Sequence, residues 1–441
     1  MRLILATLFA AMLAALPVRA ADVTVIHAGK LIDVEKGQVL KDQMITVEGD
    51  RITAVAPWHG APAGAKILDW SSRTVLPGLM DMHTHISDYG DSESNNPLEP
   101  LMHSAAESAL SGVKNARNTL LAGFTTIRDV GPWHAFTDVA IKNAINNGTI
   151  IGPRMSVVGA YITVPGGAGA ITGQIPDVGI PADMRFGVVR NADEVREKVR
   201  TLIQHGATFI KTLATGAVLT NGTEPGAPEL SEEELHAAVV EASHYGIYVA
   251  SHAHGAEGIK NAVRAGVRSI EHGSLIDDEG IALMKKHGTW LVADIYNGDY
   301  IGTVGRAEHW PEEQLRKNDE TTEAQREGFR KAVKAGVKIA YGTDAGVYPH
   351  GLNGRQMAYM VKWGMTPMQA IRSATLSAAE LLGWEKKVGS IAPGKYADII
   401  AVDGDLMKNV RLVEHVAAVM KGGVLYKEDG KPTIEAGIRH D

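Results

Sequence analysis

The sequence predicts an α/β protein: a closed (β/α)8 barrel of the TIM-barrel type, with a small β-sandwich domain built from both ends of the chain. Eight strand-like segments alternate with helix-like segments over residues 77–385. Short strands separated by glycine turns occupy both flanks, residues 21–76 and 386–441. Metal-capable or ionisable side chains also stand at the ends of five strands, where a barrel has its active site. The alternative architecture is an open doubly wound sheet, and the strands at both flanks argue against it.

Length and composition agree with a barrel enzyme. The 441 residues suit a barrel of roughly 250 to 300 residues with an added module. A net charge of -7 without blocks of like charge, and an aromatic content of 5%, argue against nucleic acid as a partner. The chain has no cysteine and 17 histidines, so any metal must be held by nitrogen and oxygen ligands.

The first residues read as an export signal. Arg2 precedes an apolar run over residues 3–16, and the pattern around Ala20 is that of a cleavage site. We therefore expect a signal peptide over residues 1–20, with cleavage after Ala20 or Ala21, and an exported protein that is periplasmic or secreted. The apolar run is short for a membrane span, so no stable membrane anchor is expected after cleavage.

The two flanks each predict half of a β-sandwich. At both ends of the chain, glycines separate short strand-like segments. At the start these segments cover residues 23–26, 30–34, 44–47 and 51–55, and at the end they lie within residues 388–402 and 416–426. The simplest interpretation of these two groups of strands is that they pair with each other and form a single β-sandwich domain.

The central region supplies the eight barrel strands. They are expected over residues 74–85, 124–130, 155–162, 209–213, 248–254, 269–272, 290–296 and 339–344. Helical patterns lie between or after them, for example over residues 192–206, 231–246 and 366–383. Ser231 followed by three glutamates is a strong helix start, because a serine cap and an acidic first turn both satisfy the helix N-terminus.

Polar side chains at the strand ends predict a metal site. On a strand, residues two apart share a face, so each His-x-His pair presents two imidazoles together. Taken alone, such a pair, a barrel lysine or a capping aspartate is as well explained by ordinary structure. Taken together they would bury several charges at one mouth, at a cost of several kcal/mol each, which a shared metal centre removes. The residues are His83, His85, Lys211, His252, His254, His272 and Asp344.

These motifs together resemble the amidohydrolase superfamily. The resemblance covers nearly all of the chain after the signal and rests on residues 81–85, 210–211, 251–255, 270–273, 342–344 and 389–399. Within the superfamily the chain is most similar to the imidazolonepropionase-like branch with a carboxylated lysine. That branch includes Xaa-Pro dipeptidases and ochratoxin-type amidohydrolases, and residues 342–355 are typical of it.

The resemblance implies two divalent metal ions, with zinc as the expected ion. His83, His85 and Asp344 would hold the first ion, and His252 and His272 the second.

Lys211 would join the two ions as a carbamate formed with CO2. An ammonium group repels a cation, whereas a carbamate offers two anionic oxygens. The implied reaction is attack of a metal-bridging hydroxide on an amide carbonyl, with Asp344 as the catalytic residue that takes the proton of the water and delivers it to the leaving nitrogen.

The expected partner is a small-molecule amide or dipeptide substrate, and we expect a homo-oligomer. His254 and His350 are candidate substrate contacts, each with a structural or surface role as the alternative. The glycine-rich residues 165–173 are expected to form a lid rather than a phosphate loop, because no helix follows. Many relatives have a histidine in this glycine run and a tyrosine at the position of His254. Their absence leaves room for bulkier N-acyl amino acids.

Three functions remain open at this point. The first is hydrolysis of an amide bond to a C-terminal amino acid. The second is a cyclic-imide hydrolase or mononuclear deaminase of the imidazolonepropionase type, against which Lys211 argues. The third is a non-catalytic scaffold, which would have lost ligands. About two, one and no metal ions per chain would distinguish them.

Overall fold

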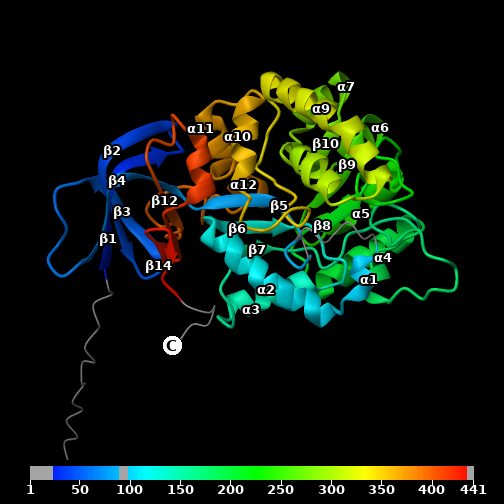
Figure 1. Ribbon diagram of the computed structural model, residues 1–441, viewed down its shortest axis with the longest axis horizontal. Coiled ribbons are helices and arrows are strands. Elements are labelled where there is room, and N and C mark those ends of the chain that lie inside the picture. The colour runs from blue at the N-terminus through cyan, green and yellow to red at the C-terminus, as the bar shows by residue number, and fades with distance from the viewer. Residues whose placement is uncertain (1–22, 89–97, 435–441) are drawn as a thin grey trace, which may run out of the picture.

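The computed structural model describes residues 23–88 and 98–434 and comprises a β-sheet domain beside an α/β barrel (Figure 1). The predicted signal peptide, residues 1–20, lies outside the described residues. Within the described ranges, no helix is both long and apolar enough to cross a bilayer.

The two ends of the chain form one eight-stranded sheet, in the order β15-β14-β13-β12-β4-β1-β2-β3. The halves meet where β12 pairs antiparallel with β4, and the Ile52 amide on β3 donates to the Lys395 carbonyl at 3.0 Å, so the sheet curls back on itself. Trp70 is fully buried in the shared core and donates to Glu428 at 3.1 Å. The strands are β1 (Val23–Asp33), β2 (Gln38–Glu48), β3 (Arg51–Pro57), β4 (Lys66–Pro77), β12 (Ile399–Asp403), β13 (Ala418–Lys421), β14 (Val424–Glu428) and β15 (Lys431–Pro432).

Gly29 lies where β1 bulges against β4. A Cβ at Gly29 would stand 1.8 Å from the Ser71 carbonyl oxygen, a backbone atom that cannot rotate away. We expect Gly29→Ala to lower the free energy of unfolding by about 1 to 3 kcal/mol, the usual cost of overpacking. Urea unfolding measures this loss. The matched control is Gly179→Ala, since a Cβ there meets nothing within 4 Å. Equal stability of the two variants would contradict the close approach.

The barrel strands form two parallel sheets, β5-β6-β7 and β8-β9-β10-β11. Parallel bridges connect these sheets on both sides: Ile162 pairs with Thr212, Leu291 with Ile339, and Thr84 with Ala345. The strands therefore follow one another in a ring, as predicted. Their bounds are β5 (Leu79–Thr84), β6 (Phe124–Asp129), β7 (Arg154–Ser156), β8 (Ile210–Leu213), β9 (Val249–Gly255), β10 (Ser269–Leu275) and β11 (Trp290–Val292).

Some barrel strands differ from the prediction. The first expected strand is divided at Gly78: the part before it pairs in the terminal sheet, and β5 begins after it. A Cβ at Gly78 would lie 2.2 Å from the Thr125 hydroxyl, so only glycine fits at this junction. The third and seventh strands are shorter than expected, and the eighth is reduced to bridges. Gly159 (φ 77°) and Asp344 (φ 59°) have positive φ, which interrupts an extended strand.

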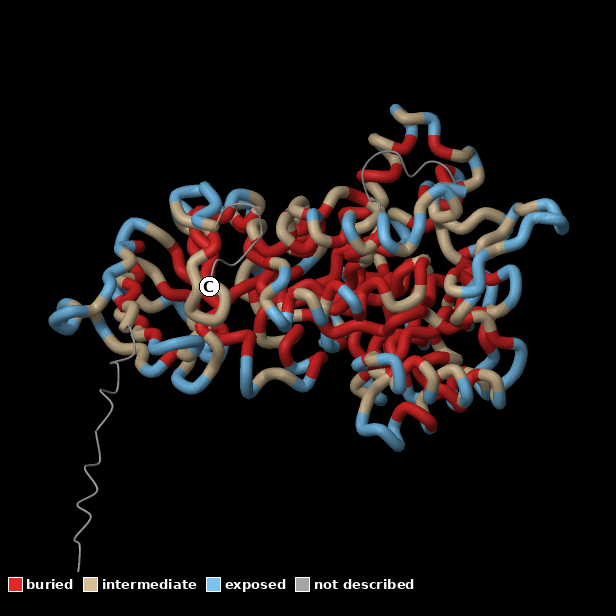
Figure 2. The backbone as a smooth tube through the Cα atoms, turned by 90° about the horizontal axis from the view of Figure 1, so that it is seen from below, coloured by how far each residue is buried: buried red, intermediate tan, exposed pale blue. Residues whose placement is uncertain are grey.

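Helices surround the ring (Figure 1), and buried residues concentrate in the middle of the barrel while exposed residues lie on its outside (Figure 2). Helix α5 begins after Ser231, whose hydroxyl accepts from the Glu234 amide in the predicted cap. The helix expected over residues 366–383 is two helices that break at Thr375 (φ -138°, ψ -94°). The helices are α1 (Glu99–Met102), α2 (Ala105–Leu121), α3 (Thr137–Asn146), α4 (Ala192–Gln204), α5 (Glu232–Ser243), α6 (Ala256–Ala265), α7 (Asp278–His287), α8 (Asn297–Tyr300), α9 (Glu312–Ala335), α10 (Arg355–Lys362), α11 (Pro367–Ser373) and α12 (Leu376–Leu382).

Candidate metal centre

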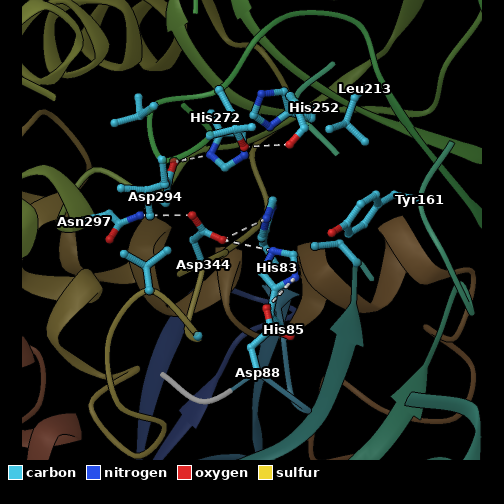
Figure 3. Close-up of a pocket in the computed structure, with 18 of the residues that line it drawn as sticks. His83, His85, Asp88, Tyr161, Leu213, His252, His272, Asp294, Asn297 and Asp344 are labelled. Carbon is cyan, nitrogen blue, oxygen red and sulfur yellow. Dashed lines mark hydrogen bonds and ion pairs between the residues drawn. The ribbon is translucent and has the colours of Figure 1, made fainter. Parts of the chain in front are cut away.

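A cavity of about 280 Å³ opens at the carboxyl ends of the barrel strands (Figure 3). It brings together seven of the eight site residues that the sequence singles out. They come from β5 and the residue that follows it, from β8, β9 and β10, and from the segment after Ile339, and they are His83, His85, Lys211, His252, His254, His272 and Asp344.

The first cluster joins His83, His85 and Asp344. The Asp344 Oδ1 atom lies 3.2 Å from His83 Nε2 and 3.3 Å from His85 Nε2. The Nδ1 atoms point outward, where His83 donates to Glu271 at 2.9 Å and His85 donates to the Gly131 carbonyl at 2.6 Å. An imidazole held through one nitrogen in this way presents the other to a metal ion. One ligand atom from each of the three residues lies within 4.8 Å of the others.

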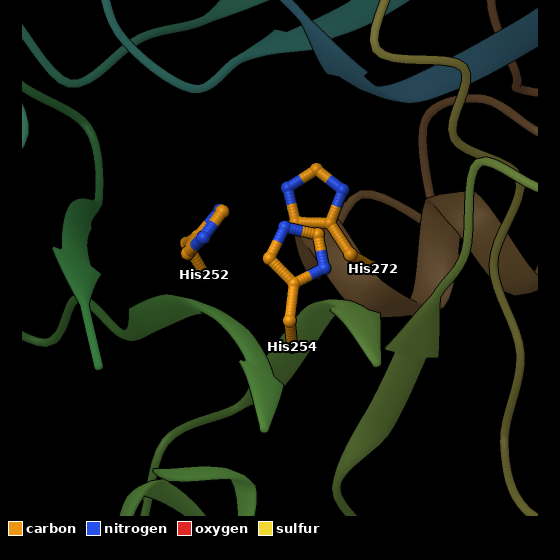
Figure 4. Close-up of side chains that lie close together, drawn as sticks. All are labelled: His252, His254 and His272. Carbon is orange, nitrogen blue, oxygen red and sulfur yellow. The ribbon is translucent and has the colours of Figure 1, made fainter. Parts of the chain in front are cut away.

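The second cluster joins His252, His254 and His272 (Figure 4). Their ring centroids are 4.6 to 4.7 Å apart. His272 Nδ1 donates to Asp294 at 3.0 Å, and His252 Nε2 donates to the Gly216 carbonyl at 3.1 Å. The two clusters are linked, because His272, Asp294 and Asp344 also bring ligand atoms within 4.8 Å of one another.

Lys211 projects from β8 into the same cavity and is 3% exposed. Burial lowers the pKa of its amine to about 8, with Arg128 adding to the shift and Glu271 opposing it. A larger fraction of the amine is then neutral near pH 7 than for an ordinary lysine, and the neutral amine is the form that reacts with CO2. The environment of Lys211 therefore fits a carbamate, and five imidazoles with one carboxylate fit divalent ions.

The charges in the cavity favour a cation. Burial works to raise the pKa of Asp344, but His83, His85 and His272 outweigh it and hold the pKa well below its usual range, so Asp344 is ionised. For His254, burial acts in the opposite direction and lowers the pKa to about 3, with neighbouring His272 adding to the effect, so this ring is neutral. Burial opposes protonation of His85, but Asp344 and Asp88 outweigh it and raise the pKa of His85 to about 9, so a metal ion bound there would take the place of a proton.

Two of the clustered residues occupy strained backbone. His272 has φ 67° and Asp344 has φ 59°, both in the left-handed region that residues with a Cβ seldom adopt. Strain of this kind persists where the surrounding structure fixes it, and it concentrates at functional sites.

His350 does not line the cavity. Its ring lies behind His85: Nε2 donates to the His85 carbonyl at 3.1 Å, and Nδ1 lies 3.2 Å from the Thr119 hydroxyl. The structure thus places His350 against the backbone of a candidate ligand. The glycine-rich segment does border the cavity through Ala168 and Ala170, and its function as a lid stays a prediction.

Several residues around the site were not singled out from the sequence. Glu271 accepts from His83 and pairs with the fully buried Arg128 at 2.6 Å. Asn297 donates to Asp344 Oδ2 at 3.0 Å. Asp294, which holds His272, lies two residues before the end of the predicted seventh strand (residues 290–296), so its place near the carboxyl end of a barrel strand was an available signal.

Tyr161 is a further residue that the motifs did not reveal. Its phenol points into the cavity (Figure 3). Two glycines flank the ring closely: a Cβ at Gly131 would lie 2.3 Å from it, and a Cβ at Gly169 would lie 2.6 Å from it. Gly169 belongs to the glycine-rich segment, so part of the glycine content there makes room for Tyr161. Burial raises the pKa of Tyr161 well above its usual value, which keeps the phenol neutral and able to donate.

Comparisons with known proteins agree with this site. Residues 74–426 match the amidohydrolase family. Ochratoxinase from Aspergillus niger is 31% identical over 433 residues, which cover 93% of this chain and 88% of that protein. A crystal structure of a Xaa-Pro dipeptidase with bound methionine is 38% identical, with a TM-score of 0.86 over 92% of this chain and 100% of the other. A prolidase complexed with N-methylphosphonate-L-proline is 29% identical, with a TM-score of 0.85 over 92% and 100%.

The matched region includes the whole barrel and every candidate ligand, and the similarity extends into the terminal sheet domain. Fold, site and similarity together identify an enzyme that hydrolyses amide bonds, and the chain belongs to the amidohydrolase family.

Proposed function

We propose that the protein is a binuclear metal-dependent hydrolase that cleaves the amide bond joining a C-terminal amino acid to its acyl or aminoacyl group. The proposed substrates are dipeptides, Xaa-Pro among them, and N-acyl amino acids of the ochratoxin A type. The observation that carries the proposal is the position of Lys211 in one cavity with both histidine clusters. A carbamate there would supply the anionic oxygens needed to join two ions.

The names of the relatives support the substrate class. Ochratoxinase, the Xaa-Pro dipeptidase and the prolidase are all similar to this chain over about nine-tenths of its length. The prolidase holds a proline derivative and the dipeptidase holds a free amino acid. An amino acid is the product expected when an amide bond to a C-terminal residue is cleaved.

The chain's own residues account for the proton transfers. Divalent ions at this site would acidify a water molecule and polarise the substrate carbonyl. Asp344, held ionised by the surrounding histidines, accepts the proton of the attacking water and delivers it to the departing nitrogen. The Asn297 amide fixes Oδ2 of Asp344 and thereby orients the carboxylate. Tyr161 offers a neutral O–H donor to a substrate oxygen.

The rest of the cavity suits a small, partly apolar substrate. Among the described lining residues, Lys211 is the only lysine or arginine, so a substrate carboxylate must bind to neutral donors or to the metal ions. Apolar side chains such as Leu213, Val218, Leu219 and Ile301 line part of the wall and can receive the acyl group.

A substrate panel tests the proposal. The purified protein, supplied with zinc and bicarbonate, is incubated with Xaa-Pro dipeptides, other dipeptides, N-acyl amino acids and ochratoxin A, and mass spectrometry detects the released amino acid. Release of the C-terminal amino acid from any member is the expected result. Failure to cleave any member of the panel, or activity confined to a cyclic imide or an aminated ring assayed alongside it, would overturn the proposal.

Replacement of Lys211 tests the carbamate. Lys211→Ala should lower kcat/KM by at least about 10²-fold, a typical loss when one electrostatic partner of the transition state is removed. A short carboxylic acid such as propionate should restore part of the activity, because its carboxylate can occupy the vacated space. Lys211→Arg, the matched control, should be inactive and should not respond, since the guanidinium fills that space. Full activity of Lys211→Ala without added acid would exclude the carbamate.

A further inference from the structure

The second histidine cluster contains one imidazole more than the resemblance assigns to a metal. His252 and His254 stand two residues apart on β9, just as His83 at the end of β5 stands two residues before His85, which directly follows that strand. In the His83–His85 pair, both Nε2 atoms approach Asp344. Figure 4 shows the β9 pair gathered with His272. The same two-residue spacing of histidines at the end of a strand therefore occurs twice at the rim of the cavity.

The hydrogen bonds orient His254 as they orient the other two rings. His254 Nδ1 lies 2.7 Å from the hydroxyl of Ser274, which is 2% exposed. With Nδ1 as the donor, Nε2 carries no proton and is available as a ligand. Among the described residues, no hydrogen-bond partner occupies His254 Nε2, His272 Nε2 or His252 Nδ1. Each ring thus has one anchored and one available nitrogen.

Burial makes these available nitrogens costly unless something binds them. His252, His254 and His272 are between 5% and 7% exposed, and one ligand nitrogen from each lies within 4.8 Å of the others. Three buried imidazoles with convergent lone pairs need a shared electrophile, and a cation is the simplest one. With Lys211 as the fourth ligand, they make the four-ligand set that zinc usually takes.

We propose that His254 is a ligand of the second metal ion, which three imidazoles then hold through His252 Nδ1, His254 Nε2 and His272 Nε2. This inference rests on the proposed binuclear function and adds one residue to its second site. It replaces the expectation that His254 contacts the substrate.

Metal binding, measured without any substrate, tests the inference. Metal content per chain and zinc affinity in competition with a chelator are determined for the wild type, His254→Ala and His254→Gln. Wild type should bind two ions. Both variants should keep the first ion and bind the second more weakly by more than about 100-fold, a loss larger than that for an outer partner of a ligand. Glutamine keeps an N–H donor of similar reach, so it would preserve a role in substrate binding while removing the ligand.

Two further variants give the matched comparison. Ser274→Ala removes only the anchor of His254 Nδ1 and should weaken the second ion by about 10-fold. His134→Gln should leave metal content unchanged. His134 lines the same cavity, but its nitrogens already contact Asp183 at 2.7 Å and the His103 carbonyl at 2.8 Å.

The outcomes separate the inference from the proposed function. Two tightly bound ions in both His254 variants, with a raised KM in His254→Ala, would overturn the inference and restore His254 as a substrate contact. A wild-type protein that binds fewer than two ions would overturn the binuclear function itself. Loss of the second ion alone in the His254 variants supports both.

Discussion

Asp344→Asn should abolish most turnover while the protein keeps most of its metal. The substitution preserves the size of the side chain and one oxygen, but the amide cannot accept a proton. Because His83, His85 and the other candidate ligands remain, the ions should still bind. Loss of a positioned general acid or base costs about 10² to 10⁴-fold in rate, and we expect kcat to fall by that amount. Steady-state kinetics on a cleaved dipeptide, with metal content measured on the same sample, provide the two readouts.

The control is Asp278→Asn, which makes the same chemical change at an exposed ion pair with Lys331 on the outside of the barrel. It should leave kcat and metal content unchanged. If Asp344→Asn retained wild-type turnover with both ions bound, another group would have to take the proton. If it lost the metal together with the activity, Asp344 would be needed chiefly as a ligand.

Arg128→Met should destabilise the folded protein by about 3 to 5 kcal/mol, the usual cost of leaving one partner of a buried ion pair alone. Arg128 and Glu271 are both fully buried and lie 2.6 Å apart. Burial alone would raise the pKa of Glu271, but Arg128 and His83 hold it well below its usual range. Without Arg128, the Glu271 charge loses its strongest partner. Urea unfolding at a fixed, saturating zinc concentration measures the loss without a contribution from changed metal occupancy.

A double variant separates the pair from general damage to the core. Arg128→Met with Glu271→Leu removes both charges, so it should be less destabilised than Arg128→Met alone. Arg316→Met is the surface control, because its ion pairs with Glu224 and Glu320 are solvent-exposed and should contribute little to stability. A loss below about 1 kcal/mol for Arg128→Met would show that Glu271 does not depend on this partner.

The sequence was sufficient for the architecture and for the residues that gather in the cavity. The reason is periodicity: His83 and His85 share a strand face wherever that strand lies, and strand order in a barrel brings Lys211, His272 and Asp344 to the same end. Both signals are local or topological, so they need no knowledge of side-chain contacts.

The partners of those residues could not be read in the same way. Arg128 reaches Glu271 across 143 positions of sequence, and no spacing rule connects them. His350 follows the eighth strand as a substrate contact would, yet the turn around it directs the ring to the back of His85. The division of the first strand at Gly78 likewise depends on the approach of Thr125, which only tertiary packing reveals.

The pairing of β4 with β12 has a consequence for the order of folding. Residues 73–77 of β4 pair with residues 399–403 of β12, which are synthesised more than 300 residues later, so this edge of β4 stays unpaired until nearly the whole chain has left the ribosome. An unpaired edge is open to association with other chains during that interval. Because β4 leads directly into β5, the strand that ends in His83 and precedes His85 also gains its final support from the last part of the chain to be synthesised. A nascent chain that stops before β12 is therefore expected to lack both a closed sheet and a well-anchored first pair of histidines.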